Sequence, residues 1–238
     1  MLTILYYLVC LVAATVLFLA SFIALVVCYP FDKKRFVVHK ISKWLTDSFF
    51  GFGLVMKRKV EGIENLDPKG TYVMVLNHNS MVDILSIYNL PLVFKWVSKK
   101  EVYRMPIVGR LLLAHGDIVI NRASTKEAMQ LVHNKGMEWL KKGASVAIFP
   151  EGTRSKSGVI NKFKDGAFTI AKIAGVDIQP VAIDGTRSAF AKGKWWIQPN
   201  TFKVTVLPRV DRETVQSMEL EELKELCRDR IVDEHKKM

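Results

Sequence analysis

The N-terminal segment constrains this chain more than any other feature, because it is long, apolar and uncharged. No Asp, Glu, Lys or Arg occurs in residues 1–31, and residues 2–28 are almost wholly aliphatic and aromatic, with a few Ala, Cys, Ser and Thr. At about 1.5 Å per residue, a helix over residues 2–28 reaches roughly 40 Å, more than the ~30 Å hydrocarbon core of a bilayer. The segment therefore predicts a helix that attaches the protein to a membrane.

A basic cluster follows at once, with Lys33, Lys34 and Arg35 directly after Asp32. By the positive-inside rule, these charges predict that the chain beyond residue 32 lies on the cytoplasmic face. A cleaved signal peptide fits less well, because the segment has no basic n-region and its apolar run is too long. The pattern favours a permanent anchor. It leaves open whether the helix spans the bilayer or lies in one leaflet.

Residues 36–56 form a second apolar surface, which a few charged residues interrupt. The spacing predicts an amphipathic helix. Such a helix either lies in the headgroup region of the membrane or turns its apolar face to a protein core, and the sequence does not separate the two. We therefore expect membrane-anchoring helices in residues 1–56 and a folded α/β domain in residues 57–238.

The charge balance narrows the classes of partner. Of 238 residues, 35 are Lys or Arg and 23 are Asp or Glu, and the net charge of +12 is carried by the chain after residue 31. A basic domain beside a membrane favours membrane lipids and lipid phosphates as partners. Nucleic acid is not expected, since the chain has no RNA-binding aromatic motif, zinc finger or arginine-rich tail. The three cysteines are too few for a disulfide framework or a thiolate zinc site, and the five histidines lack metal-ligand spacing, so no metal is expected.

Beyond residue 57, apolar runs that end in turn signals alternate with helical patterns. Strands are predicted at 71–76, 93–97, 117–120, 144–149, 178–183 and 202–207, and helices at 81–89, 106–114, 124–142, 166–174 and from 213 onward. This alternation predicts an α/β fold with a mostly parallel sheet flanked by helices. Ligands bind such sheets at the carboxyl ends of the strands, so residues that follow a strand are the candidate functional residues.

The segment after the first of these strands holds His78 and Asp83, five residues apart. On one continuous helix the two would lie on different faces, but across a strand-to-helix turn they can meet. A carboxylate bound to one imidazole nitrogen fixes the tautomer and raises the basicity of the other, which makes His78 a candidate general base. The alternative is that Asp83 caps a helix and His78 is an ordinary loop residue.

The strand at 144–149 leads into Glu151, Gly152, Thr153 and Arg154. Arg154 can clamp a phosphate with two hydrogen bonds, and Gly152 lets backbone N–H groups approach an anion. The pattern therefore indicates an anion-binding turn. The alternative is a surface turn with a local ion pair between Glu151 and Arg154.

Taken together in their order, these segments resemble the membrane glycerolipid acyltransferase family, which includes the 1-acylglycerol-3-phosphate acyltransferases. His78 and Asp83 match its His-x4-Asp motif, and Gly116–Arg122, Phe149–Ser155 and Pro180–Ile183 match its second, third and fourth blocks. The resemblance covers about residues 60–210, and the apolar N-terminus also fits. Gln179 departs from the pattern, because an aliphatic residue is commoner there. The implied fold is that of a glycerol-3-phosphate acyltransferase.

The resemblance implies acyl transfer from an acyl thioester, either acyl-CoA or acyl carrier protein, to the sn-2 hydroxyl of lysophosphatidic acid, giving phosphatidic acid for phospholipid biosynthesis. The thioester is a co-substrate, and no cofactor is expected. It implies that His78, steadied by Asp83, takes the hydroxyl proton. The implied site for the substrate phosphate consists of Arg122, Glu151, Gly152, Thr153, Arg154 and Lys99. Within it Glu151 would orient an arginine or a glycerol hydroxyl. Backbone N–H groups near residues 79–81, or a helix N-terminus there, are expected to hold the thioester oxyanion.

Several alternatives stay open. A Ser80–His78–Asp83 triad would form a covalent acyl-enzyme, and a membrane esterase of this kind would release the acyl group to water without an acceptor. A basic scaffold for anionic lipid or nucleic acid would not depend on His78, and its binding would fall steeply with salt. Within the family, glycerol-3-phosphate, another lysophospholipid or a lyso-aminolipid are alternative acceptors.

Overall fold

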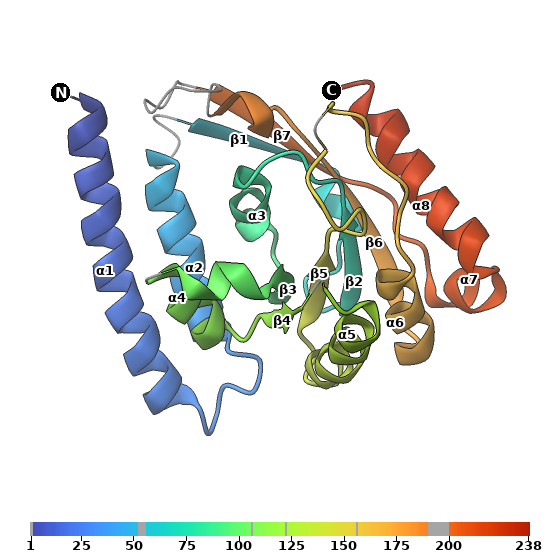
Figure 1. Ribbon diagram of the computed structural model, residues 1–238, viewed down its shortest axis with the longest axis horizontal. Helices are drawn as coiled ribbons and strands as arrows, with labels where there is room; N and C mark the ends of the chain where they lie inside the picture. Colours follow the sequence, from blue (N-terminus) through green and yellow to red (C-terminus); the bar gives the residue numbers. More distant parts are fainter. Residues whose placement is uncertain (1, 52–55, 106, 122, 156, 190–199) are drawn as a thin grey trace.

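The structure is a computed structural model, and it describes residues 2–51, 56–105, 107–121, 123–155, 157–189 and 200–238 (Figure 1). The described residues form a seven-stranded sheet with strand order β1-β7-β6-β2-β5-β3-β4. The strands are β1 (Met56–Glu61), β2 (Tyr72–Leu76), β3 (Phe94–Lys99), β4 (Ile118–Ile120), β5 (Ser145–Ile148), β6 (Asp177–Asp184) and β7 (Asn200–Val206). Strands β2 to β6 all run in one direction, whereas β7 pairs antiparallel with β6 and parallel with β1. The predicted α/β fold with a mostly parallel sheet is confirmed.

Helices lie on both sides of this sheet (Figure 1). The helices are α1 (Leu2–Cys28), α2 (Phe36–Phe49), α3 (Val82–Ser86), α4 (Val108–His115), α5 (Thr125–Lys141), α6 (Gly166–Ala174), α7 (Arg212–Ser217) and α8 (Leu220–His235). Helices α1 to α4 gather on one side, and α5 to α8 gather on the other. The predicted terminal helix is thus two helices, α7 and α8. Most predicted strands lie within a residue or two of the observed ones.

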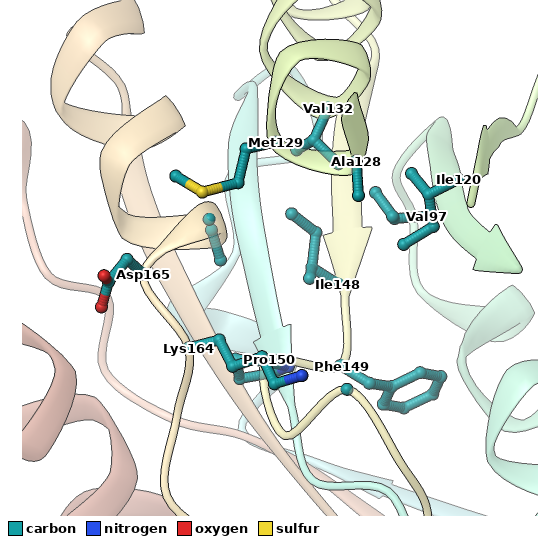
Figure 2. Close-up of a pocket in the computed structure, with 13 residues that line it drawn as sticks. Val97, Ile120, Ala128, Met129, Val132, Ile148, Phe149, Pro150, Lys164 and Asp165 are labelled. Carbon is teal, nitrogen blue, oxygen red and sulfur yellow. The ribbon is translucent and has the colours of Figure 1, made fainter. Parts of the chain in front are cut away.

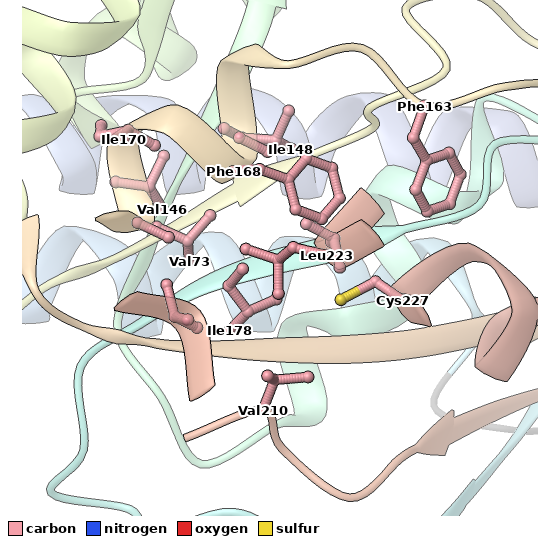
Figure 3. Close-up of a cluster of buried hydrophobic side chains, with 14 of the residues drawn as sticks. Val73, Val146, Ile148, Phe163, Phe168, Ile170, Ile178, Val210, Leu223 and Cys227 are labelled. Carbon is pink, nitrogen blue, oxygen red and sulfur yellow. The ribbon is translucent and has the colours of Figure 1, made fainter. Parts of the chain in front are cut away.

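Two apolar cores form because successive side chains of a strand point to opposite faces of the sheet. In β2, Val73 and Val75 join a core with residues of α5, α6 and α8, which Figure 3 shows. Met74 and Leu76 of the same strand join the second core, on the side of α2 and α3. All four side chains are fully buried. β2 is therefore the centre of the sheet, and the segment that follows it is held from both faces.

Helix α1 leaves most of its apolar surface uncovered, and only 6% of its most apolar stretch is buried by the rest of the protein. Val12, Ile23 and Val27 are each more than 60% exposed. Within the described residues, α1 is the one helix long and apolar enough to cross a membrane. A surface of this kind is stable only in lipid or against another apolar surface, so the protein is membrane-associated.

Helix α2 is shorter than the predicted amphipathic helix over residues 36–56. It ends at Phe49, and Met56 already begins β1. The reason is packing: Phe50 and Met56 are buried in the second core, where a continuing helix could not place both. On α2 itself, Val38, His39 and Ile41 are buried, so this face turns to the protein. The division of the chain into residues 1–56 and 57–238 stays a prediction.

Candidate active site

The two motifs meet at the carboxyl ends of β2 and β5, which are neighbours in the sheet. The His78 segment follows β2 and leads into α3, and the Glu151 segment follows β5. A direct hydrogen bond links the two, because the Ser155 N–H donates to the His78 carbonyl over 2.8 Å. The sequence separates these motifs widely, and the parallel pairing of β2 with β5 brings them together.

His78 and Asp83 are in contact, as the motif predicts, with Nδ1 of His78 2.9 Å from Oδ2 of Asp83. Both residues are buried, and His78 keeps 7% of its surface exposed. The N–H groups of Asn79 and Ser80 each donate to the same Asp83 oxygen over 2.7 Å, and the Thr186 hydroxyl donates to the other oxygen. An aspartate held by these donors cannot rotate away. It accepts the Nδ1 proton, so Nε2 of His78 is left as the proton acceptor.

Thr186 is a residue that the sequence analysis did not single out. It follows β6 directly, and it reaches Asp83 across the sheet edge. Its position at the carboxyl end of a strand is the signal that could have identified it.

These contacts occupy two of the N–H groups expected at the oxyanion site, and an oxyanion site near residues 79–81 stays a prediction. The N–H groups of Asn79 and Ser80 are already bound to Asp83, and the Val82 N–H donates to the Ser80 hydroxyl over 3.3 Å. They therefore have no free hydrogen to offer a thioester oxygen. Within the described part of the chain, the Ser80 hydroxyl has no hydrogen bond to His78, so the arrangement does not favour a Ser80–His78–Asp83 triad.

Glu151 is a positioning residue in this structure. Its Oε1 accepts the His78 N–H over 2.7 Å, and its Oε2 accepts both the backbone N–H and the side-chain amide of Asn161 over 2.8 Å. Among the described residues this carboxylate has no ion pair with Arg154, and its place in the substrate site stays a prediction. It ties the backbone of His78 to the loop before α6. Asn161, which the sequence analysis did not identify, is its partner.

The plane of the imidazole is set by an aromatic stack. The Phe149 ring lies parallel to the His78 ring, with centroids 3.9 Å apart and planes 11° from parallel. The Trp96 ring stacks on Phe149 in turn, with centroids 4.8 Å apart. Phe149 follows β5 immediately and Trp96 is a buried residue of β3. The His78 imidazole is thus supported by two stacked aromatic rings, those of Phe149 and of the buried Trp96.

The exposed edge of His78 opens into a pocket of about 420 Å³, which we call the catalytic pocket. Lys99, Thr153 and Arg154 line it together with His78. Three of the predicted phosphate-site residues are therefore beside the candidate base. Arg122 lies outside the described residues, so its place in the site stays a prediction. Gly152 has a φ of +75° and lies on the other side of the turn, against the Lys164 side chain.

An apolar cavity of about 570 Å³ adjoins the catalytic pocket, and we call it the anchor-side cavity. The two share Met81, Ile84, Ser98 and Val102. Side chains of α1, α2, α3 and α4 line the cavity, so the apolar N-terminal helix contributes directly to its wall. The described residues that line it include no Asp, Glu, Lys or Arg. A cavity of this shape and polarity fits a hydrocarbon chain.

The described residues include no group of three His, Cys, Asp or Glu side chains that could hold a metal ion.

Comparison with known proteins agrees with this geometry. A family model described as Acyltransferase matches residues 57–184. The chain is 39% identical over 157 residues to the chloroplastic 1-acyl-sn-glycerol-3-phosphate acyltransferase LPAT1 of Arabidopsis thaliana, which covers 65% of this chain and 43% of that protein. It is 31% identical over 194 residues to the 1-acyl-sn-glycerol-3-phosphate acyltransferase of Borreliella burgdorferi, covering 81% of this chain and 74% of the other.

A solved structure shares the fold. The crystal structure of the 1-acyl-sn-glycerophosphate (LPA) acyltransferase PlsC from Thermotoga maritima matches with a TM-score of 0.76 and 26% identity, covering 99% of this chain and 94% of that chain. The chain belongs to the acyltransferase family, as the resemblance of its motifs predicted. It spans 43% to 54% of the length of the first curated relatives that it matches.

Proposed function

We propose that this protein transfers an acyl group from acyl-CoA or acyl carrier protein to the sn-2 hydroxyl of 1-acylglycerol-3-phosphate and so forms phosphatidic acid. The relatives named for this reaction support the substrate class. One observation carries the proposal: the pocket that exposes the His78–Asp83 pair also exposes Lys99 and Arg154. A general base and two cations for a phosphate therefore face one space.

The chemistry follows from the orientation of His78. Nε2 removes the proton of the acceptor hydroxyl while the oxygen attacks the thioester carbonyl. The resulting imidazolium is stabilised by the buried Asp83 carboxylate, which contacts Nδ1. When the tetrahedral intermediate collapses, the carbon–sulfur bond breaks and the imidazolium proton passes to the leaving thiolate. An ester and a free thiol result, and no covalent acyl-enzyme is needed.

The anchor-side cavity supports the placement of the donor. A thioester whose carbonyl lies beside His78 can extend its acyl chain past Met81 and Ile84 into this cavity. Burial of each methylene stabilises the bound chain by about 0.8 kcal/mol. The chain would lie along α1, which is the part of the protein that contacts the membrane.

The orientation toward the cytoplasm is part of the same proposal. The basic residues Lys33, Lys34 and Arg35 follow α1 directly, and the positive-inside rule assigns such clusters to the cytoplasmic side. Acyl-CoA and acyl carrier protein are soluble, whereas the acceptor is a membrane lipid. A catalytic pocket on the cytoplasmic side of the membrane therefore meets both the donor and the acceptor.

Thiol release tests the proposal. The detergent-purified full chain is incubated with palmitoyl-CoA or palmitoyl acyl carrier protein, with and without lysophosphatidic acid. We expect thiol release that requires the acceptor, and phosphatidic acid as its product. His78→Ala should lose nearly all turnover and stay folded. His133→Ala is the matched control, because His133 is a partly exposed residue of α5 that hydrogen-bonds to its neighbour Asn134 and does not line the catalytic pocket.

Other outcomes separate the alternatives. Release without an acceptor would favour a membrane esterase. Release that requires glycerol-3-phosphate, another lysophospholipid or a lyso-aminolipid in place of lysophosphatidic acid would keep the reaction and replace the acceptor. Full turnover by His78→Ala would contradict the general-base mechanism. No release with any of these donors and acceptors would contradict the proposed activity.

A further inference from the structure

A second cavity, of about 460 Å³, lies on the other side of the Phe149–Ser155 turn (Figure 2). We call it the α5-side cavity. Its wall consists of aliphatic side chains from β3, β4 and β5 and of Ala128, Met129 and Val132 from α5. Val132 and Ile148 belong to the core shared with α6 and α8, and Val97 and Ile120 pack on it, whereas the anchor-side cavity lies over the other core. The two cavities are therefore on opposite faces of the sheet.

The α5-side cavity adjoins the catalytic centre. It shares Val97 and Phe149 with the catalytic pocket. Phe149 is the residue whose ring stacks on His78. A molecule whose reactive carbon lies at His78 can thus reach either cavity, one on each face of the sheet.

A cation, Lys164, stands at one end of the α5-side cavity. Figure 2 shows Lys164 beside Pro150 and Phe149, with the α5 side chains farther in. The Lys164 N–H donates to the Pro150 carbonyl over 2.9 Å, which fixes this residue to the catalytic turn. Its ammonium group packs so closely on Gly152 that a Cβ there would lie 2.8 Å from Nζ. Gly152 is favoured at this position by its positive φ, and the Lys164 ammonium group lies directly against it.

The charge of Lys164 is available to a ligand. The neighbouring Asp165 pairs instead with Lys224, with Oδ1 2.7 Å from Nζ. Within the described part of the chain, no carboxylate pairs with Lys164. Asp165 also lines this cavity, but its carboxylate is paired with Lys224, so Lys164 is the cation among the described residues that stays unpaired there. A largely apolar cavity with one unpaired cation at its end fits a ligand that has an apolar or weakly polar chain and a terminal phosphate.

A thioester donor has two arms, and each needs a path away from His78. The acyl arm is placed in the anchor-side cavity, beside the membrane helices. The carrier arm of acyl-CoA and of acyl carrier protein is the same group, 4′-phosphopantetheine, and its soluble carrier approaches from the side away from α1 and α2. The α5-side cavity is lined by residues of α5, and α5 lies on that side of the sheet (Figure 1). We propose that the α5-side cavity binds the phosphopantetheine arm of the donor and that Lys164 contacts its phosphate. This proposal rests on the proposed acyl transfer.

Steady-state kinetics of Lys164→Glu test it. We expect the KM for palmitoyl-CoA and for palmitoyl acyl carrier protein to rise about tenfold, the effect of losing one charged phosphate contact. The KM for lysophosphatidic acid should not change. Lys141→Glu is the matched control, since Lys141 is an exposed residue at the far end of α5. Ala128→Phe, which fills the cavity without a change of charge, should shift the same donor KM.

Inhibition by the free arm gives a second readout. We expect 4′-phosphopantetheine to compete with the donor and Lys164→Glu to weaken this inhibition about tenfold. Pantetheine, which lacks the phosphate, should inhibit the variant and the unchanged protein alike. A rise in the KM for lysophosphatidic acid, or unchanged kinetics in both variants, would overturn the proposal. A loss confined to palmitoyl-CoA would overturn it too, because it would assign the contact to the nucleotide.

Failure of the proposed function has a different signature. A protein that binds 4′-phosphopantetheine through Lys164, as measured by calorimetry, but acylates none of the acceptors would contradict the acyl transfer and leave the binding site standing. Normal formation of phosphatidic acid with donor kinetics insensitive to Lys164 and Ala128 would contradict the binding site alone.

Discussion

The imidazole of His78 lies flat on the phenyl ring of Phe149, with ring centroids 3.9 Å apart. Asp83 fixes the imidazole in its own plane through Nδ1, and Phe149 fixes the orientation of that plane. A general base held in both respects needs little reorganisation when the acceptor hydroxyl arrives. Phe149 carries no chemistry itself and acts through the position of His78.

Replacing the flat ring should therefore impair catalysis more than stability. We expect Phe149→Leu to lower kcat about tenfold, because leucine fills the space but offers no planar support. The KM for lysophosphatidic acid should change little. Acceptor-dependent thiol release measures both constants. Phe163→Leu removes a buried ring of the core on the α5 side and serves as control. An equal fall of kcat in the control would show that only general packing was lost.

Asp83→Asn should lower kcat about 10²- to 10⁴-fold, because an amide no longer favours the tautomer with a free Nε2 and cannot stabilise the imidazolium. In this variant the amide also faces the N–H groups of Asn79 and Ser80, which donate to the Asp83 carboxylate in the unchanged protein.

Thr186→Val removes one donor to Asp83 and should lower kcat only several-fold, with recovery in Thr186→Ser. Single-turnover acyl transfer measures these effects. Activity of Asp83→Asn near that of Thr186→Val would contradict the role of the carboxylate.

Glu151→Gln should destabilise the catalytic turn although the shape of the side chain is kept. One end of the amide would present N–H groups to the donors of His78 or Asn161, and an unpaired buried donor costs about 1–3 kcal/mol. We expect a lower melting temperature in detergent together with a lower kcat. Glu138→Gln is the control, since Glu138 makes its ion pairs on the surface of α5. A variant that melts normally and loses only phosphate binding would restore Glu151 to the substrate site.

Lys95 should make stability rise with pH. Its side chain is fully buried, and Nζ has no hydrogen-bond partner among the described residues. Burial lowers the pKa of Lys95 to about 7, although the nearby Asp117 raises it in part. Between pH 7 and the ordinary pKa of 10.5, the unfolded state binds more protons than the folded state, so the free energy of unfolding rises with pH across this interval.

Lys95→Met should remove that dependence. At pH 7 and below the variant should be more stable by about 1–4 kcal/mol, because the cost of burying the charge is gone. Its advantage should shrink as the pH rises toward 10.5, because the folded protein is then neutral at this site and the unfolded state also begins to lose its proton. Melting temperatures from pH 6 to 10 measure the difference, and Lys141→Met controls for loss of an exposed charge. A constant difference across this range would show that Lys95 stays charged in the folded protein.

The order of strands and helices could be predicted because each depends on neighbours in the chain. The apolar run at 71–76 and the acid, glycine and arginine after 149 are local patterns, and they correctly indicated the sheet edge that carries His78 and Arg154. Strand β1 was not predicted, because no local pattern in its sequence indicates a strand. Its basic residues Lys57, Arg58 and Lys59 hide the strand pattern, and the strand forms because β7 pairs beside it.

The sequence by itself determined the membrane-associated helix and the α/β class, since both follow from periodicity, and its motifs indicated the pairing of His78 with Asp83 through their resemblance to the acyltransferase family. Only the tertiary structure decided which residues support that pair. Glu151 binds the His78 N–H from 73 positions away, and Thr186 binds Asp83 from 103 positions away. No local pattern records such a partner, because the hydrogen bond exists only after distant strands have been placed side by side in the sheet.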